Sequence, residues 1–282
     1  MRRSTETLLD NALRGVSYVI VGTVAYIIFD IVWNGAGALD WAFLTTRPST
    51  GGAEGGIFPA IVGTGALVFG TLITAVPLGM ACAIFLSEYA TQGPLVRGIR
   101  LAIVTLAGIP SIVFGLFGLA LFVILLGFGA SILAGSLTLA CMALPVVIVA
   151  SEEALRAVPQ GLRAGSLALG ATQWYTIRHN VLPYAIPGMI TGSILALGRV
   201  AGETAPILFT AAAFFLPRLP QSVYDQVMAL PYHLYILATQ HPDADAVRPQ
   251  QYGTALVLLL LVLSVSLVAI IVRYRIRKKY RW

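Results

Sequence analysis

The stretch SEEALRAVPQGLRAGSLALGATQWYTIRHNVLPYAIPG, residues 151–188, joins two long apolar runs and is the most informative segment of the chain. Within it, Leu162, Ser166 and Leu169 share one helical face. Gly170 stands where the C-terminal cap of a helix is expected, because glycine adopts the left-handed conformation of such caps without strain. These spacings predict a short helix that ends in a glycine turn.

A second short helix is predicted after the glycine. Thr172 can cap its first turn, and Leu182-Pro183 is expected to end it before Pro187-Gly188 opens the next apolar run. Two short helices joined by a glycine turn form a compact protrusion. Such a protrusion is suited to docking in a groove of a partner protein.

The composition around this loop is that of an integral membrane protein. Hydrophobic residues make up 58% of the chain and charged residues 11%, against about 25% charged residues in a soluble domain. The formal net charge is +6, but the basic residues are dispersed at the ends of apolar runs, which argues against nucleic-acid binding. Cys82 and Cys141 lie within apolar runs and are expected to be small core residues rather than a disulfide framework.

Six apolar stretches are long enough to cross a bilayer, which takes about 20 residues of helix. They cover about 16–37, 59–87, 100–128, 131–151, 185–213 and 253–272. Strand-period alternation is not seen in them, so helices are the expected spanning elements. The sequence therefore predicts an all-α membrane protein, with residues 1–282 forming a single transmembrane domain.

The arginines and lysines predict the orientation of these spans. With the N-terminus inside, the inner segments hold 14 of them and the outer segments three, which places both termini in the cytoplasm. An alternative is a signal peptide over residues 1–38, which begin basic and end in small residues. The apolar run is about 22 residues, longer than a usual signal core, and it contains Asp30, so an uncleaved first span is predicted.

The fifth apolar run contains the segment GRVAGETAPIL, residues 198–208, which carries two charged residues. Arg199 lies roughly 21 Å into a helix that starts near Ala185, and Glu203, four residues on, shares its face. Pro206 is expected to bend the helix just beyond this pair and to leave the carbonyl of Gly202 free.

Small and polar residues surround this pair. Gly198 and Gly202 have the spacing that lets another helix approach closely, while Thr204 and Thr210 add hydroxyl groups. Charged residues inside a membrane are costly and mark transport pathways by default. The segment is interpreted as part of a polar path.

The loop resembles the EAA loop of ATP-binding-cassette importer permeases, in which a glycine, nine residues, an apolar position, any residue and Leu-Pro follow one another. Gly170 and Leu182-Pro183 keep this spacing, whereas Ala164-Gly165-Ser166 stand where the family has Glu-Ala-Ala and Asn180 stands at the apolar position. Four further segments are similar to phosphate-specific transport permeases, and the first and the last of them resemble the A-type subunit (PstA) rather than its C-type companion. They are GGIFPAIVGT (55–64), IPSIVFGLFGLALF (109–122), GETAP (202–206) and ALPYHLYILA (229–238).

This resemblance implies the MetI-like permease architecture and a function as one of two permease subunits of an ATP-driven phosphate importer in the bacterial inner membrane. The implied partners are a PstC-type permease, two PstB-type ATPase subunits and a PstS-type extracytoplasmic phosphate-binding protein. Residues 152–184 would be the loop that couples the chain to an ATPase. Its implied coupling residues are Arg163, Ser166, Leu169, Gly170, Ala171, Leu182 and Pro183.

The chain itself is not expected to be an enzyme. It contains no Gly-Lys-Ser/Thr, and its only lysines are Lys278 and Lys279, so it cannot hold a P-loop. ATP and Mg²⁺ would be used by the partner ATPase, and no cofactor or metal is expected on this chain. Ser151 and His179 show no arrangement of a nucleophile and its base.

The expected site for substrate translocation consists of Arg199, Glu203 and Thr204. A guanidinium recognises phosphate through paired hydrogen bonds, and Glu203 would hold Arg199 when the path is empty. The alternative is an Arg–Glu pair that only fixes helix packing. The sequence is also compatible with sulfate or molybdate as substrate, with a self-sufficient secondary anion transporter, and with a membrane scaffold or sensor.

Several further polar residues are assigned structural roles. Asp30 is expected to be an interfacial cap or helix partner, and Glu152 and Glu153 to cap a helix at the start of the inner loop. Scattered surface polarity, rather than a metal site, is expected for the histidines and aspartates of the outer segment, which are His233, His241, Asp243 and Asp245.

Overall fold

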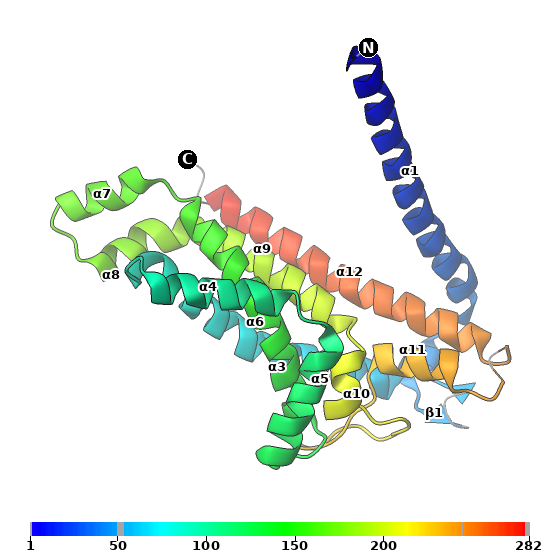
Figure 1. Ribbon diagram of the computed structural model, residues 1–282. Coiled ribbons are helices and arrows are strands. Elements are labelled where there is room, and N and C mark those ends of the chain that lie inside the picture. Colours follow the sequence, from blue (N-terminus) through cyan, green and yellow to red (C-terminus); the bar gives the residue numbers. More distant parts are fainter. Residues whose placement is uncertain (1, 50–53, 244, 280–282) are drawn as a thin grey trace.

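The computed structural model describes residues 2–49, 54–243 and 245–279 and is built almost entirely of helices (Figure 1). Five of the helical runs in these residues are long and apolar enough to cross a membrane, and there are six if a sharply bent pair counts as one span. The all-α fold expected from the sequence is thereby confirmed.

The long helices are α1 (Arg2–Gly35), α3 (Phe58–Ile84), α6 (Ile132–Arg156), α9 (Leu182–Ala201) and α12 (Arg248–Lys279). The shorter α-helices are α2 (Trp41–Thr45), α4 (Pro94–Ala107), α5 (Ser111–Gly118), α7 (Gln160–Ala168), α8 (Gln173–Thr176), α10 (Ala205–Thr210) and α11 (Leu230–Thr239). Three π-helical segments extend α3, α5 and α8, namely η3 (Phe85–Tyr89), η4 (Leu119–Leu125) and η5 (Ile177–Val181). A 3-10 turn, η1 (Ala36–Ala38), follows α1, and strands β1 (Pro48–Ser49) and β2 (Glu54–Gly55) pair antiparallel.

Helix α6 is the central element of the fold and packs against α3, α4, α5, α9 and α10. Small residues let its neighbours approach closely. A Cβ atom added at Gly79 of α3 would lie 2.6 Å from Val147, and one added at Gly192 of α9 would lie 2.2 Å from Ala150. Close backbone approach through small residues is the usual way helices associate in membranes.

The third apolar stretch, 100–128, is not one straight span. Helices α4 and α5 meet at an angle of 103°. Gly108 caps the end of α4, and Pro110 precedes α5. A proline has no N–H to donate and restricts the residue before it to extended conformations, so the helix cannot continue through Ile109-Pro110.

The fifth stretch, 185–213, is also interrupted. Helix α9 ends at Ala201, and α10 begins at Ala205, so the break covers residues 202–204 and contains Glu203, rather than lying just beyond it at Pro206. Gly202 caps the end of α9, and Pro206 falls in the first turn of α10, where its missing N–H is harmless.

Leu182-Pro183 does not end the helix after Thr172, contrary to the expectation from the sequence. Helix α8 passes through η5 directly into α9, with Pro183 in the first turn of α9 and Pro187 inside it. The N–H of Leu182 bonds to the carbonyl of Ile177, five residues back. This wider π turn shifts the register just before the proline ring, which would otherwise collide with the preceding turn.

The first and last long helices meet at only one end. A Cβ atom added at Gly35 of α1 would lie 2.7 Å from the carbonyl oxygen of Tyr252 in α12, and the Tyr252 hydroxyl donates to Asp30 at 3.0 Å. Asp30 is thus a helix partner, as the sequence indicated. From this contact the two helices diverge: α12 runs toward the end of the molecule that carries α7, while α1 stands apart from the other helices (Figure 1). We call the end that carries α7 the α7 end and the opposite one the α11 end.

Candidate functional site

The charged pair expected in the fifth span is present. Nε of Arg199 lies 3.4 Å from Oε1 of Glu203. Arg199 occupies the last turn of α9, and Glu203 lies in the break that follows, so the pair bridges the end of the helix. The Arg199 side chain is 54% exposed and that of Glu203 is 16% exposed.

Glu203 borders a small crevice near the α11 end. Five helices contribute to its lining: α3 through Thr64, α6 through Leu139, α9 through Val200, α10 through Ile207 and α11 through Pro231. The hydroxyl of Thr64 accepts a hydrogen bond from the backbone N–H of Leu230 at 2.8 Å, which fixes α3 to α11. Glu203 is therefore held where α3, α9 and α11 meet.

The remaining residues of this segment divide between the surface and the interior. Thr204 is half-buried at the start of α10, whereas Thr210 is buried and donates to the carbonyl of Pro206 at 2.8 Å. Gly198 faces α12, where an added Cβ atom would lie 3.7 Å from the Ser266 hydroxyl. Thr204 thus lies beside the charged pair, and Thr210 does not take part in it.

The exposed guanidinium of Arg199 restricts what can adjoin this face of α9. Its helical neighbour Leu195 is 68% exposed, so the charge stands on an otherwise apolar surface. A charged side chain facing hydrocarbon is strongly unfavourable. The face must therefore adjoin another protein surface or a water-filled passage rather than lipid tails.

The loop between α6 and α9 has the predicted helix–turn–helix shape. Gly170 has φ +83° and ends α7, a conformation that L side chains rarely adopt. The Thr172 side chain accepts from the N–H of Tyr175 at 3.3 Å and so caps α8. The hydroxyls of Ser166 and Thr176 lie 2.8 Å apart and join the two short helices.

The tip of this loop is apolar and open. Leu169 is 91% exposed and Trp174 is 56% exposed. Beside them lies a groove of about 750 Å³ between α7 and α8. Its lining residues are Gly161, Leu162, Gly165, Ser166, Leu169, Gly170, Ala171, Thr172, Tyr175 and Asn180. An exposed leucine and tryptophan beside a groove form a surface suited to binding a partner protein.

Other predicted loop residues point inward. Leu182 packs in an apolar cluster around Leu86, Leu155 and Met189, at the base of the loop. Arg163 is 14% exposed and forms an ion pair with Glu88 of η3, its Nη2 lying 2.7 Å from Oε1. Sequence reasoning missed Glu88, because 75 residues separate it from Arg163 and no local spacing connects them.

The acidic residues at the start of the loop are not caps of a new helix. Glu152 and Glu153 lie inside α6, which continues to Arg156. Glu152 is 9% exposed and pairs with Arg100 of α4 at 3.2 Å, while Glu153 pairs with Arg156 on the surface at 3.7 Å. Glu152 therefore has a tertiary partner that its place in the sequence did not reveal.

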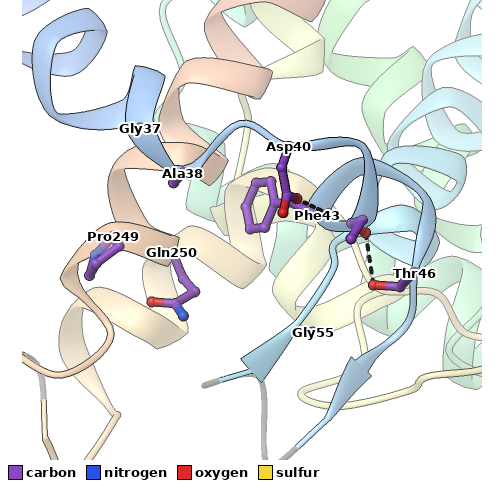
Figure 2. A pocket seen from close by; sticks show the side chains of 9 residues that line it. Gly37, Ala38, Asp40, Phe43, Thr46, Gly55, Pro249 and Gln250 are labelled. Atoms are coloured by element: carbon purple, nitrogen blue, oxygen red, sulfur yellow. Dashed lines mark hydrogen bonds between the residues drawn. The ribbon is translucent and has the colours of Figure 1, made fainter.

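A polar hollow of about 360 Å³ lies at the α11 end, between the turn after α1 and the start of α12 (Figure 2). Asp40 and Phe43 line it, and the Asp40 carboxylate accepts from the Phe43 N–H and so caps α2. Thr46 donates to the carbonyl of Ala42 at 2.8 Å. These polar groups therefore serve the local fold.

The histidines of the outer segment differ from each other. His233 is 4% exposed, so surface polarity was the wrong interpretation for it, and its burial lowers the pKa to about 4. His241 is half-buried, and its Nδ1 lies 2.9 Å from the carbonyl oxygen of Asp243. Within the described part of the chain, no three histidine, cysteine, aspartate or glutamate side chains are grouped to hold a metal ion.

Sequence comparison gives a family match over most of the chain. Residues 75–282 match the family described as binding-protein-dependent transport system inner membrane component. A probable ABC transporter permease protein of Bacillus subtilis (strain 168), YqgI, is 38% identical over 90% of this chain and 88% of its own length.

Relatives with a more specific name are equally similar. The phosphate transport system permease protein PstA 1 of Mycobacterium tuberculosis (strain H37Rv) is 38% identical over 80% of this chain and 72% of its own length. The phosphate transport system permease protein PstA of Mycobacterium leprae is 40% identical over 76% of this chain and 69% of its own length.

Solved structures of importers share the fold. A chain of the inward-facing MetNI methionine ABC transporter matches with a TM-score of 0.62 and 18% identity, over 78% of this chain and 97% of that one. A chain of a bacterial ABC transporter that imports alginate matches with a TM-score of 0.60 and 14% identity, over 89% and 95% of the two chains.

Proposed function

Because the chain belongs to the family of binding-protein-dependent transport system inner membrane components, we propose that it is the permease subunit of an ATP-driven importer of inorganic phosphate. It forms half of the translocation path, and a companion permease of the PstC type forms the other half. The names of the mycobacterial relatives support phosphate as the substrate.

The observation that carries this proposal is the half-exposed Arg199 paired with Glu203 at a helix break. Phosphate is an anion that a guanidinium binds through two parallel hydrogen bonds. Because 54% of the Arg199 side chain is exposed, phosphate can reach the guanidinium beside the carboxylate. Glu203 then holds Arg199 between transport cycles, and Thr204 supplies a neighbouring hydroxyl.

The loop at the α7 end couples the permease to ATP hydrolysis by the partner subunits. Two ATPase subunits of the PstB type bind ATP and Mg²⁺, and this chain binds no cofactor of its own. The exposed Leu169 and Trp174, with the groove beside them, form the docking surface for an ATPase subunit. An extracytoplasmic binding protein of the PstS type delivers phosphate at the α11 end.

The orientation follows from the positive charges. Fourteen arginines and lysines lie in the segments assigned to the cytoplasm, against three outside, which puts both termini and the α7 end in the cytoplasm of a bacterial inner membrane. The divergence of α1 and α12 from a shared contact at the α11 end agrees with this topology (Figure 1).

The test is transport by the reconstituted complex. The chain is co-purified with its companion permease and ATPase subunits, placed in liposomes with the binding protein, and assayed for ATP-dependent uptake of phosphate, sulfate and molybdate. Phosphate uptake that needs ATP and all subunits supports the proposal. Uptake of another oxyanion only, uptake by this chain alone without ATPase, or no uptake by the assembled complex would each refute it.

A further inference from the structure

The end of span two is tied to both short helices of the coupling loop through one residue, Glu88 in η3. Arg163 of α7 binds both carboxylate oxygens, because Nε also lies 3.1 Å from Oε2. Gln173 of α8 donates to the backbone carbonyl of Glu88 at 2.6 Å. Neither α7 nor α8 can move relative to α3 without breaking one of these contacts.

Arg163 also holds the end of α6. Its Nη1 donates to the carbonyl of Val158 at 2.7 Å, and its Nη2 donates to the carbonyl of Leu155 at 2.9 Å. The carbonyls at a helix C-terminus have no partner within the helix and carry the negative end of its dipole. A single guanidinium therefore joins α7 to the ends of both α3 and α6.

A second arginine makes the reciprocal connection. Arg100 of α4 donates to the carbonyl of Leu86 in η3 at 2.8 Å and pairs with Glu152 of α6. Arg163 thus combines the acid of α3 with carbonyls of α6, and Arg100 combines the acid of α6 with a carbonyl of α3. The two clamps lock the ends of α3 and α6 together at the base of the loop.

The ion pair between Arg163 and Glu88 is rigid. The side chains are 14% and 8% exposed, so solvent and salt screen their attraction little. Two parallel charge-assisted hydrogen bonds also fix the orientation of the guanidinium plane. Exposed pairs such as Glu153 and Arg156 lack this constraint, since their side chains are 69% and 49% exposed.

Helix α3 connects this clamp to the charged pair of the translocation path. It is helical from Phe58 to Ile84, with Pro77 inside it, and its far end carries Thr64, which lines the Glu203 crevice and caps α11. The 24 residues from Thr64 to Glu88 span about 36 Å of helix. Helix α3 therefore connects Glu88 at the base of the loop to the Glu203 crevice.

We propose that Glu88 and Arg163 are positioning residues that transmit the displacement of the coupling loop to α3, and through α3 to the Glu203 crevice. This inference rests on the proposed function, since it assigns a route by which ATP hydrolysis changes the path. The route runs beside the direct connection from the loop through η5 into α9.

The experiment measures phosphate transported per ATP hydrolysed, in liposomes that contain the whole complex. The variants are Glu88→Gln, which keeps the shape but removes the charge, and Arg163→Lys, which keeps the charge but cannot reach all four acceptors. Glu153→Gln is the matched control, because it removes an exposed carboxylate from the same region. Co-purification of the subunits reports assembly.

We expect at least a fivefold fall in the transport ratio for Glu88→Gln and Arg163→Lys in assembled complexes, and no change in the control. Wild-type ratios in both single variants would overturn the inference while leaving the proposed function intact. If one of the two variants fails to assemble, the other decides, and a wild-type ratio in it overturns the inference. A wild-type complex that moves no phosphate refutes the proposed function and the inference with it.

Discussion

Arg199 and Glu203 face each other across the end of helix α9, with Nε 3.4 Å from Oε1, and only the glutamate is sheltered by neighbouring helices. Because their side chains differ in solvent exposure, the two residues have different roles. The half-exposed arginine is free to meet an anion, whereas the glutamate is held in the crevice between α3 and α11. The pair thus presents a cation at the surface and keeps its counter-ion fixed beside it.

Replacing Arg199 by Gln should lower ATP-driven phosphate uptake at least tenfold. A neutral amide cannot form charge-assisted paired hydrogen bonds to phosphate. Arg199→Lys should retain partial activity, because it keeps the charge but loses the planar fork. Uptake of radiolabelled phosphate by reconstituted complexes provides the measurement, with subunit co-purification as the control for assembly. Full uptake by assembled Arg199→Gln and Glu203→Gln complexes would reduce the pair to a packing role.

Replacing Leu169 by Ser should weaken binding of the ATPase subunits about tenfold without destabilising the chain. The side chain is 91% exposed in the isolated chain, so it contributes little to the fold and is accessible to an ATPase subunit. Burying a leucine contributes about 1.5–3 kcal/mol, and 1.4 kcal/mol corresponds to a factor of about ten in affinity. Titration of purified ATPase subunits against the permease in nanodiscs measures this change.

Val223→Ser is the control for this experiment, because Val223 is also exposed but lies at the α11 end, beside the start of α6. It should leave ATPase binding unchanged. Equal binding by the Leu169 variant and the wild type would show that the loop tip is not the docking surface.

Substituting Gly63 by Ala should destabilise the chain by about 1–3 kcal/mol, the usual cost of overpacking. An added Cβ atom would lie 2.0 Å from the carbonyl oxygen of Met228, and a backbone atom cannot move aside as a side chain end can. Gly65→Ala is the matched control two residues away, with open space around the added atom. The melting temperatures of both variants in detergent test whether α3 packs closely on the segment before α11. Equal melting temperatures for the two variants would contradict this packing.

Stability should fall as the pH drops from about 6.5 to about 4, because of His233. The unfolded chain protonates this imidazole near its ordinary pKa of 6.5, but burial lowers the pKa in the folded chain to about 4. The unfolded state therefore binds the proton first over this range, and the loss amounts to about 3 kcal/mol. Unfolding of the purified chain in detergent, followed as a function of pH, measures the loss.

His233→Gln should flatten this pH dependence, because it removes the buried imidazole. An identical pH profile in the His233 variant and the wild type would rule out His233 as the cause.

The apolar runs and the short motifs at their ends were sufficient to predict the spans and the helix–turn–helix loop. Hydrophobic length is a local property, and so are the caps supplied by Gly170 and Thr172. The sequence predicted the positions of the helix breaks less accurately. The sequence showed Pro110, but a proline can kink a helix slightly or turn it by 103°, and packing of α5 against α10 selects the larger angle.

The sequence by itself determined that this chain is a helical membrane protein, that Arg199 and Glu203 share a face, and that a glycine-turned loop joins two of its spans. Each of these depends on residues within a few turns of one another. Only the tertiary structure decided that Glu88 meets Arg163, that Thr64 reaches the Glu203 crevice, and that His233 is buried. These contacts join segments far apart in the chain, and they form only when helix packing brings α3, α6 and α11 together.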